Sequence, residues 1–434
     1  MSPSTTRFTN RSGAIGGAPV STRSNSVAAG CRKLAHACNP NPRTTTRAKG
    51  HAALSCGQMP PRTVLAVNAG SSTVKCAAFA LDEPPQLLVR DTIDGGDEAS
   101  RTARLMQWIE DHMRLGGDAA VAAIGHRFVH GGRSHRHPEL LTPALLIELR
   151  QLVAFAPNHL PGEIALVERL AAQHPRVAQY ACFDTAFHAD LPEVARRLPI
   201  PDEYDAEGIE RYGFHGLSYA YVLREFERLA GTDAASGRLV LAHLGNGSSL
   251  AAVHRRRSVD TTMAFTPIGG VVMSTRTGDL DPGVVTYLAR SRRMTADEVE
   301  DLLSKHSGLQ GISGDSGDMR RLLEREAVHP PSRLAVDAYV YSIRKAIGAF
   351  AAALGGMDAL IFSGGIGEHA GVVRARICDG LAFLGVMLDG THNAANAAVI
   401  SSSSARVTVR VIPTDEEIMI ARAARSLLLP DSPS

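Results

Sequence analysis

The sequence lacks the features that would place it in a disulfide-bonded or membrane-spanning class. Three of its six cysteines lie in the first 59 residues, and the other three are far apart without CxxC spacing. This distribution favours free thiols in a reducing compartment over a disulfide framework. The most apolar window, residues 346–362, is interrupted by Gly355, Gly356 and Asp358, so we expect no segment that spans a bilayer.

Acidic residues are absent from the first 59 positions, which contain eight Arg or Lys. The rest of the 434-residue chain carries 38 basic and 44 acidic residues, a net charge of −6, although the whole chain is at +2. No basic stripe with interleaved aromatic residues indicates nucleic acid binding. We expect a soluble, cytoplasmic protein whose partners are neither nucleic acids nor membranes.

Residues 1–58 are rich in Ser, Thr, Arg and Gly and show no periodic apolar pattern, which predicts disorder. The same acid-poor, Arg-rich composition is also typical of an organelle transit peptide. We favour a simpler interpretation, in which this segment is a loose tail or a start assigned too early. Met59 stands four residues before the first strand-like run and supports it.

From Thr63 onward, short apolar runs alternate with helical patterns, which indicates an α/β architecture. The expected strands are residues 63–67, 75–81, 122–129, 179–183, 238–244, 249–253, 358–363 and 406–412.

Several helices have recognisable ends. Thr295 and Glu298 form a capping-box pattern, with Gly308 beyond the helix that follows. Ser332, after two prolines, is expected to open a long helix that Gly355 and Gly356 close. Thr414 with Glu417 is expected to begin the last helix.

One stretch is repeated. Residues 64–74, "VLAVNAGSSTV", reappear as "VLAHLGNGSSLAAV" at 240–253, so that a strand, a Gly/Asn turn and a second strand recur near the start of each half. We infer two similar lobes with facing glycine turns.

Glycine turns of this kind hold anions well, because their backbone N–H groups are concentrated and accessible. The turn in "VNAGSSTVK" is not a Walker loop, since GxxxxGK[ST] is absent and an extended run follows it. Alone it could be a plain hairpin. A second turn at 245–248 favours a polyphosphate held between the lobes.

A third turn, "FSGGIGEHAG" at 362–371, admits a competing interpretation. Gly365, Gly367 and Ala370 satisfy GxGxxA, and Asp389 follows 24 residues after the first of these, as in a dinucleotide-binding unit. Only 64 residues follow Ala370, so a turn packed under an adenosine fits better.

Two other motifs carry weaker alternatives. The segment "GDSGD" at 314–318 is similar to the loop around a serine-protease nucleophile, but no paired cysteines or suitable histidine motif accompany it. His126 and His130 share one face of a strand pattern without a third zinc ligand.

Four charged residues lie beside glycine-punctuated turns: Arg127, Asp184, His215 and Arg276. Each alone is more often part of a surface ion pair. Together with the glycine turns they indicate a site.

Nine motifs then carry a resemblance to the acetate kinase family, over about residues 63–428. In family order they are "VNAGSSTVK", "GHRFVHGG", "FDTAFH", "RYGFHG", "HLGNGSSL", "TRTGDLDPG", "GISGDSGDMR", "FSGGIGE" and "IPTDEE". The resemblance implies two ribonuclease-H-like lobes of the actin-like ATPase superfamily, with ATP in the cleft between them. It implies reversible transfer of the γ-phosphoryl of ATP to acetate, giving acetyl phosphate and ADP, with Mg²⁺ (or Mn²⁺ in its place) and a homodimer.

The resemblance also assigns residues. The catalytic set is Asp184, His215 and Arg276, with Asp184 expected to orient an arginine or a metal-bound water. The substrate set is Arg127 for the carboxylate, Val129, Phe214 and Pro267 for the acyl group, and Asn158 and His159 beside them. The nucleotide set is Ser71, Thr73, Lys75, His243, Leu244, Gly245, Asn246, Gly247, Asp318, Met319, Arg320, Gly364, Gly365, Ile366, Gly367 and Glu368. The metal-linked pair is Asn68 and Glu416.

Two positions depart from the family pattern. Asn158 stands where an apolar residue precedes the family's histidine, and Ser274 stands where glycine is usual. A polar amide in an acetate-sized pocket predicts a shifted preference, toward a hydroxylated or slightly larger acid.

The alternatives are a propionate or butyrate kinase of the same fold and a regulatory ATPase without catalysis. We expect the first lobe to span 63–197 and regain the helix at 414–428, with the second lobe at 198–413.

Overall fold

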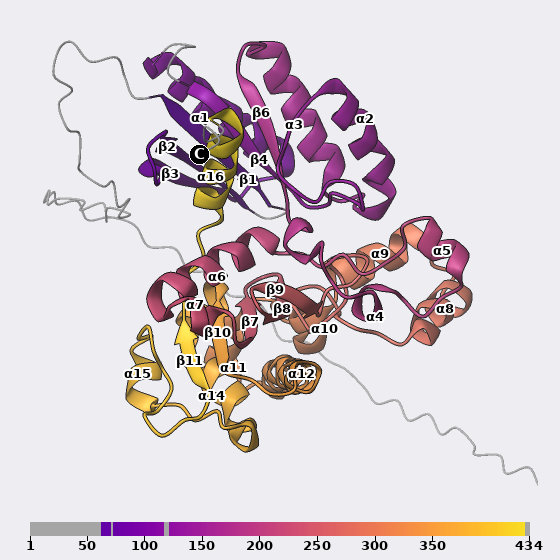
Figure 1. Cartoon of the computed structure of the whole chain (residues 1–434). Coiled ribbons are helices and arrows are strands. Elements are labelled where there is room, and N and C mark those ends of the chain that lie inside the picture. The colour runs from indigo at the N-terminus through magenta and orange to yellow at the C-terminus, as the bar shows by residue number, and fades with distance from the viewer. Residues whose placement is uncertain (1–61, 71–72, 117–120, 430–434) are drawn as a thin grey trace, which may run out of the picture. The chain divides into compact units, whose positions relative to one another are not determined.

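The computed structural model describes residues 62–70, 73–116 and 121–429, so the predictions for residues 1–58 lie outside the described residues. Two mixed sheets organise the chain (Figure 1). The first contains β1 (Thr63–Ala69), β2 (Thr73–Ala80), β3 (Gln86–Asp94), β4 (Val121–Phe128), β5 (Glu139–Leu140) and β6 (Ala178–Phe183). The second contains β7 (Arg238–Leu244), β8 (Ser248–His254), β9 (Arg257–Thr261), β10 (Ala359–Ser363) and β11 (Thr408–Val411).

The two sheets share one topology. Their orders are β3-β2-β1-β4-β6-β5 and β9-β8-β7-β10-β11, so the first five strands correspond one to one. In each sheet the first three strands of the sequence are antiparallel neighbours. The next strand, β4 or β10, pairs in parallel with the first, and β6 or β11 pairs in parallel with that strand. The repeated sequence forms the β1–β2 hairpin in one sheet and the β7–β8 hairpin in the other. The predicted pair of ribonuclease-H-like units is therefore confirmed.

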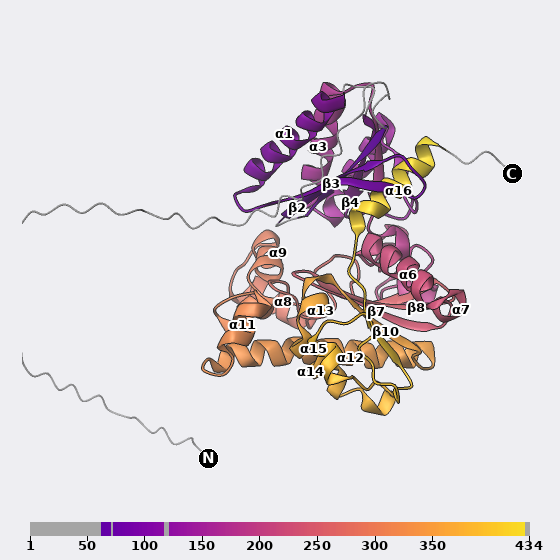
Figure 2. The same cartoon turned by 90° about the vertical axis from the view of Figure 1, so that its left-hand side faces the viewer.

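The first sheet is covered by helices on both faces, because its central strands are apolar on both sides. Leu65 and Val67 of β1 pack toward α1 (Glu98–Gly116) and α3 (Leu160–Gln173). Val64 and Ala66 face the other way, toward α16 (Glu416–Leu428). The last helix of the chain thus packs on the first sheet, as Figures 1 and 2 show.

The second sheet repeats this layering. Val240 and Ala242 pack toward α12 (Pro330–Leu354), whereas Leu239 and Leu241 pack toward α6 (Gly216–Ala230). In Figure 2, α12 and α6 lie on opposite sides of β7 and β8.

The remaining helices connect these layers. They are α2 (Pro143–Gln151), α4 (Glu193–Arg196), α5 (Asp202–Ala206), α7 (Thr232–Ala235), α8 (Pro282–Ser291), α9 (Ala296–Lys305), α10 (Gly308–Ser313), α11 (Met319–Arg325), α13 (Gly364–His369), α14 (Gly371–Asp379) and α15 (Gly390–Ala394), with short 3₁₀ turns at Leu152–Phe155, Ala186–His188 and Ala382–Leu384.

One predicted helix start is confirmed and two are wrong. The capping box of Thr295 and Glu298 is present at the start of α9, and Gly308 lies beyond that helix, as the first residue of α10. The long helix α12 opens at Pro330, because proline needs no N–H partner in the first turn and the His329 side chain accepts from Ser332 N. Asp415, not Thr414, caps α16 by accepting from Ile418 N. Gly355 closes α12 with a φ of 68°, as predicted.

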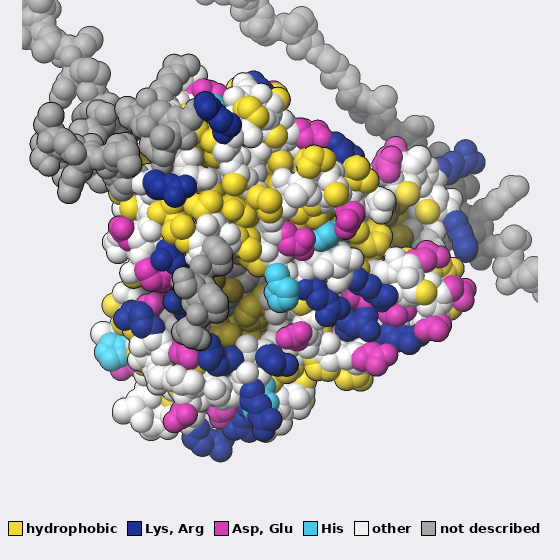
Figure 3. All heavy atoms as spheres, turned by 45° about the horizontal axis from the view of Figure 1, so that its top comes forward, with side chains coloured by type: hydrophobic (Ala, Val, Ile, Leu, Met, Phe, Trp, Pro, Cys, Tyr) yellow, Lys and Arg dark blue, Asp and Glu magenta, His cyan; other side chains and the backbone are white. Residues whose placement is uncertain are grey.

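No helix among the described residues is long and apolar enough to cross a bilayer. On the face drawn in Figure 3, Lys and Arg side chains lie intermixed with Asp and Glu, and hydrophobic side chains gather in a broad patch. Cys76, Cys182 and Cys378 are buried free thiols.

Candidate functional site

Two cavities lie next to each other, and each is lined by residues that belong to both the first and the second sheet or to the loops beside them. The larger, about 650 Å³, is lined by the two hairpin turns, the start of α11, the α13 turn and the start of α16. Predicted residues on its wall are Thr73, Lys75, His215, His243, Gly245, Asn246, Gly247, Asp318, Met319, Arg320, Gly364, Gly365, Ile366, Glu368 and Glu416. We call it the nucleotide cavity.

The second cavity has a volume of about 590 Å³ and is called the acyl cavity. Its predicted lining residues are Arg127, Val129, His159, Phe214, His215, Pro267 and Arg276. Four residues line both cavities: His215, Asn246, Gly247 and Asp318. The two cavities therefore meet at the turn between β7 and β8.

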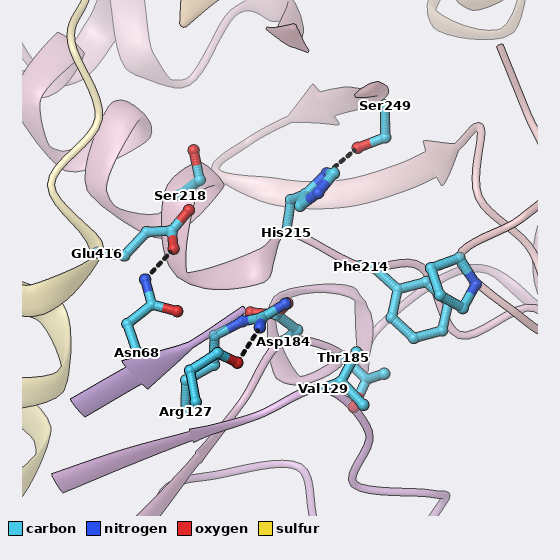
Figure 4. A network of polar contacts seen from close by, with 12 residues as sticks. Asn68, Arg127, Val129, Asp184, Thr185, Phe214, His215, Ser218, Ser249 and Glu416 are labelled. Carbon is cyan, nitrogen blue, oxygen red and sulfur yellow. Dashed lines mark hydrogen bonds and ion pairs between the residues drawn. The ribbon is translucent and has the colours of Figure 1, made fainter. Parts of the chain in front are cut away.

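Arg127 and Asp184 form a buried ion pair at the acyl cavity (Figure 4). Arg127 is the next-to-last residue of β4 and Asp184 follows β6, so parallel neighbouring strands bring them to the same end of the sheet. Arg127 Nε and Nη2 donate to one Asp184 oxygen at 3.0 and 2.5 Å. Burial raises the pKa of Asp184, while the charge of Arg127 acts in the opposite direction. Arg127 lines the cavity, whereas Asp184 is 1% exposed and lies behind it.

Arg276 carries a positive charge without a paired carboxylate. Its Nη1 donates to the carbonyl oxygen of Pro267 at 3.1 Å, and no described carboxylate lies within ion-pair distance. Burial and the nearby Arg127 lower its pKa to about 10, which leaves it protonated at neutral pH. A half-buried, unpaired guanidinium facing a cavity favours an anion as the occupant.

His215 precedes α6 with a left-handed φ of 61°. Its Nδ1 lies 2.9 Å from Ser249 Oγ (Figure 4), and Ser249 Oγ lies 2.5 Å from the Tyr219 hydroxyl. Burial, together with the charges of His243 and Arg127, holds the pKa of His215 well below 6.5. If Tyr219 donates to Ser249 and Ser249 donates to Nδ1, then Nε2 carries the hydrogen and can donate to a ligand.

Gly247 brings His215 and Arg276 together. A Cβ atom built on Gly247 would lie 3.2 Å from His215 Nε2 and 3.5 Å from Arg276 Nη1. A side chain at this position would therefore crowd both donors, which approach the same backbone.

The nucleotide cavity contains a second histidine. His243 Nδ1 lies 2.8 Å from Ser218 Oγ, and its ring stacks on His215 with the centroids 4.4 Å apart. Burial, aided by the charge of Lys75, lowers the pKa of His243 to about 4. Both rings are thus neutral at pH 7, and the positive charges of this wall come from Lys75 and Arg320, beside the carboxylates of Asp318, Glu368 and Glu416.

The α13 turn is fixed from two sides. Glu368 Oε1 accepts from Gly364 N at 2.9 Å and from Thr414 N at 3.2 Å. The fully buried Arg374 donates to the carbonyl oxygens of Gly367 and Glu368. This backbone is therefore held in place without a ligand.

Asn68 links the first hairpin to α16. Its Nδ2 donates to Glu416 Oε2 at 2.6 Å (Figure 4) and to Glu417 Oε1 at 3.1 Å. Burial raises the pKa of Glu417, while the hydrogen bond from Asn68 lowers it. Because the amide nitrogen donates to these two carboxylates, the Oδ1 atom of Asn68 is the one that could bind a metal ion.

Sequence reasoning missed Glu163, a buried carboxylate beside this site. Its oxygens accept from Val129 N at 3.3 and 3.2 Å, and burial raises its pKa to about 8. An acid in the first turn of a helix has an ordinary explanation in the helix dipole, so no signal singled it out. Nearby, burial and the charges of Arg127 and Arg276 lower the pKa of His159 to about 3.

The placement of Asn158 in the acyl pocket is wrong. Its side chain is exposed, does not line the acyl cavity, and donates to Glu300 Oε1 of α9 at 2.8 Å. The turn before α3 directs His159 into the cavity and its neighbour away from it. The shifted acid preference therefore loses the support of Asn158.

The other departure, Ser274, does line the acyl cavity. Its Oγ donates to the carbonyl oxygen of Gly317 at 2.8 Å and lies 3.3 Å from Asn246 Oδ1. Its polar group is therefore satisfied internally and is not left for a substrate oxygen.

Leu244 and Gly367 do not line the nucleotide cavity. Leu244 is buried in the core of the second sheet, and Gly367 packs against it, so each can offer only backbone atoms. Ser71 lies outside the described residues. The lining residues that the prediction did not include are Gly70, Thr275, Gln310, Gly317, Leu323, His369, Ala370 and Thr414.

The competing motifs have other partners. His126 Nε2 contacts Gln179 Oε1 at 2.8 Å, and His130 Nδ1 accepts from Gly132 N. Within "GDSGD", Ser316 Oγ accepts from Asp318 N, and Asp318 caps α11. The GxGxxA segment lies in a sheet that contains antiparallel strands, unlike the parallel sheet of a dinucleotide-binding fold.

Curated relatives cover most of the chain. The acetate kinase of Rhodopseudomonas palustris (strain TIE-1) is 47% identical over 331 residues, which are 76% of this chain and 82% of that enzyme. The acetate kinase of Nitrobacter hamburgensis is 41% identical over 400 residues, covering 86% of this chain and 97% of that enzyme.

Solved structures agree in fold. A Francisella tularensis propionate kinase has a TM-score of 0.76 at 31% identity, covering 83% of this chain and 98% of its own. Porphyromonas gingivalis acetate kinase has a TM-score of 0.74 at 32% identity, covering 85% and 100%. The family profile described as the acetokinase family matches residues 88–422. The chain belongs to the acetokinase family.

Proposed function

We propose that this protein is a kinase that transfers the γ-phosphoryl group of ATP to acetate, reversibly, giving acetyl phosphate and ADP. The observation that carries the proposal is the junction of the two cavities at His215, Asn246, Gly247 and Asp318. One cavity has a glycine-lined wall whose backbone N–H groups and the cations of Lys75 and Arg320 suit a polyphosphate, and the other has two guanidinium groups suited to a carboxylate.

The nucleophile needs charge neutralisation more than a base. A carboxylate with a pKa of about 4.5 is already ionised at neutral pH. Two unit charges about 4 Å apart repel by about 4 kcal/mol at an effective dielectric of about 20. Arg127 binds the acetate carboxylate and reduces this repulsion, with its guanidinium fixed by Asp184.

Transfer proceeds in line. A carboxylate oxygen forms a bond to the γ-phosphorus, the bond from that phosphorus to the bridging oxygen breaks, and ADP leaves with the electron pair. Arg276 and the His215 Nε2–H donate to the equatorial oxygens, where they approach Gly247. Val129, Phe214 and Pro267 surround the methyl group and exclude water.

Asp184 acts as a positioning residue in this scheme. No proton has to leave the carboxylate, so no general base is needed. Its two contacts instead orient Arg127, and its charge offsets part of the desolvation cost of that guanidinium.

The nucleotide residues follow from the cavity wall. Thr73, Lys75 and the turn that contains Gly245–Gly247 bind the phosphates through a cation and backbone N–H groups. Asp318, Met319 and Arg320 lie with the α13 turn on the rest of the wall and would surround the adenosine.

The proposal includes Mg²⁺, with Mn²⁺ as a substitute. Glu416 and Asn68 Oδ1 offer the oxygen ligands that Mg²⁺ prefers, and no described cluster of three His, Cys, Asp or Glu forms a complete metal cage. One or two protein oxygens complemented by phosphates and water is the usual arrangement for Mg²⁺ in kinases. When bound, the ion would neutralise negative charge on the phosphates.

We also propose a homodimer that works in the cytoplasm. Helix α8 has no buried residue although it contains Val284, Val285 and Tyr287, which are 39%, 37% and 56% exposed. An apolar helix face of this kind supports a contact with a second copy. The use of ATP and three free thiols support the cytoplasm. Light scattering of Val284→Glu/Val285→Glu, which we expect to give monomers, tests the dimer.

A hydroxamate assay with MgATP and acetate tests the reaction. We expect acyl phosphate from the wild-type chain and a loss of about 10²–10³-fold in kcat for Arg276→Ala, because it removes a donor to the transition state. The fold should be unchanged in that variant, since Arg276 has no described ion-pair partner. ATP hydrolysis that is indifferent to the carboxylate would instead identify a regulatory ATPase, and a higher kcat/KM for propionate or butyrate would identify a different acyl kinase.

A further inference from the structure

A third cavity, of about 720 Å³, lies between α6 and α16 and shares no lining residue with the nucleotide and acyl cavities. Its walls come from the loop after β2, the 3₁₀ turn that contains Phe187, the β8–β9 turn and one side of each helix. We call it the α6–α16 cavity.

The floor of this cavity is apolar. Phe187 and Leu223 belong to the core between α6 and the second sheet, and Ile418 and Met419 to the core between α16 and the first sheet. The cavity thus lies where the edges of two hydrophobic cores meet. A ligand with an apolar part would cover these partly exposed side chains and remove their surface from water.

The charges on the wall do not balance. Each of its three carboxylates already has an arginine partner: Glu225 pairs with Arg228, Glu227 with Arg256, and Glu83 with Arg425. Arg224 and Arg422 remain, and no described carboxylate lies within ion-pair distance of either.

Arg422 is the more constrained of the two. Among the described residues its only hydrogen bond is from Nη1 to the Met419 sulfur at 3.9 Å, and its buried Nε has no described hydrogen-bond partner. Burial and the positive charge of Arg224 lower its pKa, and the more distant carboxylates of Glu83 and Asp415 offset only part of this effect. An anion placed between the two guanidinium groups would relieve this repulsion and satisfy the unpaired donor.

The position of the cavity relates it to catalysis. Arg224 lies on α6, which begins directly after His215, and Arg422 lies on α16, which begins at Glu416. A ligand that binds both arginines would fix the spacing of these two helices. It would thereby affect the relative position of His215 and Glu416, which both line the nucleotide cavity.

We propose that the α6–α16 cavity binds a small organic anion, with one carboxylate or phosphate group between Arg224 and Arg422 and an apolar body on the floor, and that this binding changes the catalytic rate. The second part rests on the proposed function, whereas binding itself does not.

The binding test uses the full chain with excess MgADP, so that the nucleotide cavity is filled. Phenyl phosphate and benzoate are titrated against bound 8-anilinonaphthalene-1-sulfonate, a fluorescent aromatic anion. We expect saturable displacement and, in Arg224→Gln/Arg422→Gln, an affinity at least about tenfold weaker, as for loss of charge-assisted hydrogen bonds. Comparison of the two competitors decides which acidic group the site prefers.

Arg150→Gln/Arg333→Gln, on the exposed faces of α2 and α12, removes the same charge elsewhere and should leave the affinity unchanged. Equal affinities in the wild type and the Arg224/Arg422 variant would overturn the site. Circular dichroism checks folding, and the single change of the exposed Arg224 to Gln provides a milder variant, expected to weaken binding by a smaller factor.

The catalytic arm measures kcat at saturating MgATP and acetate with increasing phenyl phosphate. We expect a change of at least about twofold in the wild type and none in Arg224→Gln/Arg422→Gln, since only the former can bind across both helices. Binding with a constant kcat would overturn the coupling but keep the site. A chain without kinase activity would refute the proposed function, while the binding arm would still decide the site.

Discussion

Two guanidinium nitrogens of Arg127 donate hydrogen bonds to the same oxygen of Asp184, at 3.0 and 2.5 Å, and the third donates to the carbonyl oxygen of Ala69. The guanidinium is thus fixed on three sides before any substrate arrives. Asp184 contributes to the site by fixing that geometry.

Removing one member of this pair should harm stability and activity by different amounts. Arg127→Ala leaves a buried carboxylate unpaired, so we expect a loss of about 3–5 kcal/mol in the free energy of unfolding. Adding Asp184→Ala should restore part of that stability, measured by urea unfolding, but not the kcat/KM for acetate. A double variant as unstable as Arg127→Ala alone would contradict this account.

Gly247→Ala should reduce kcat without unfolding the protein. The new methyl group would lie 3.2 Å from His215 Nε2 and 3.5 Å from Arg276 Nη1, where the phosphoryl group has to pass. We expect a loss of about 10²-fold, as for removal of one transition-state donor. Gly348→Ala is the matched control, because nothing lies within 4 Å of the added atom in α12. It should keep full activity and gain about 0.5–1 kcal/mol in unfolding free energy.

The acyl preference should depend on Val129 and not on Asn158. Val129 lines the acyl cavity, and Val129→Ala should raise the kcat/KM ratio of propionate to acetate by about tenfold, the usual effect of one methylene. Asn158→Leu should leave the order of acetate, propionate and glycolate unchanged, since that side chain points away to Glu300. A large change in this order for Asn158→Leu would place the residue back in the pocket.

Stability should be greatest at about pH 7. Burial lowers the pKa of His126, His130, His159, His188 and His243 from 6.5 to about 4 or below, and it holds the pKa of His215 well below 6.5. Between those values the unfolded chain binds protons that the folded chain does not, so stability falls as the pH drops from about 6.5 to about 4.

Glu163 acts in the opposite direction. Its pKa rises on folding from 4.5 to about 8, so the folded state holds a proton, and stability falls as the pH increases through that window. Below about pH 7 the histidines outweigh it, and above about pH 7 their remaining effect is smaller than that of Glu163. Urea midpoints from pH 4.5 to 8 should show this maximum, and Glu163→Gln should remove the decline on the alkaline side. A midpoint that increases from pH 6.5 to 5 would contradict the assignment.

Much of the fold could be predicted because central strands are short apolar runs bounded by glycine turns. All eight predicted strands are present, and the repeated hairpin revealed the twofold architecture. The strands that were not predicted, β3, β5 and β9, all lie at sheet edges. In β3 only Ile93 is buried, so the strand shows no alternation of apolar and polar residues.

The site was predictable to the extent that its residues lie beside strand ends and glycine turns. Arg127, Asp184 and His215 follow this rule, and the structure brings them to one region. Asn158 was misplaced because sequence order cannot tell which of two neighbours a turn directs inward. Glu163 was missed because its buried contact with Val129 N depends on how α3 packs against β4.

Helix α16, the last of the described chain, completes one face of the first sheet by packing on β1 and β4. During synthesis on the ribosome, Val64 and Ala66 therefore have no cover until the final helix has emerged. The first sheet would have to wait for α16, more than 200 residues further along the chain, and would depend on chaperones or on slow elongation to avoid aggregation in the meantime.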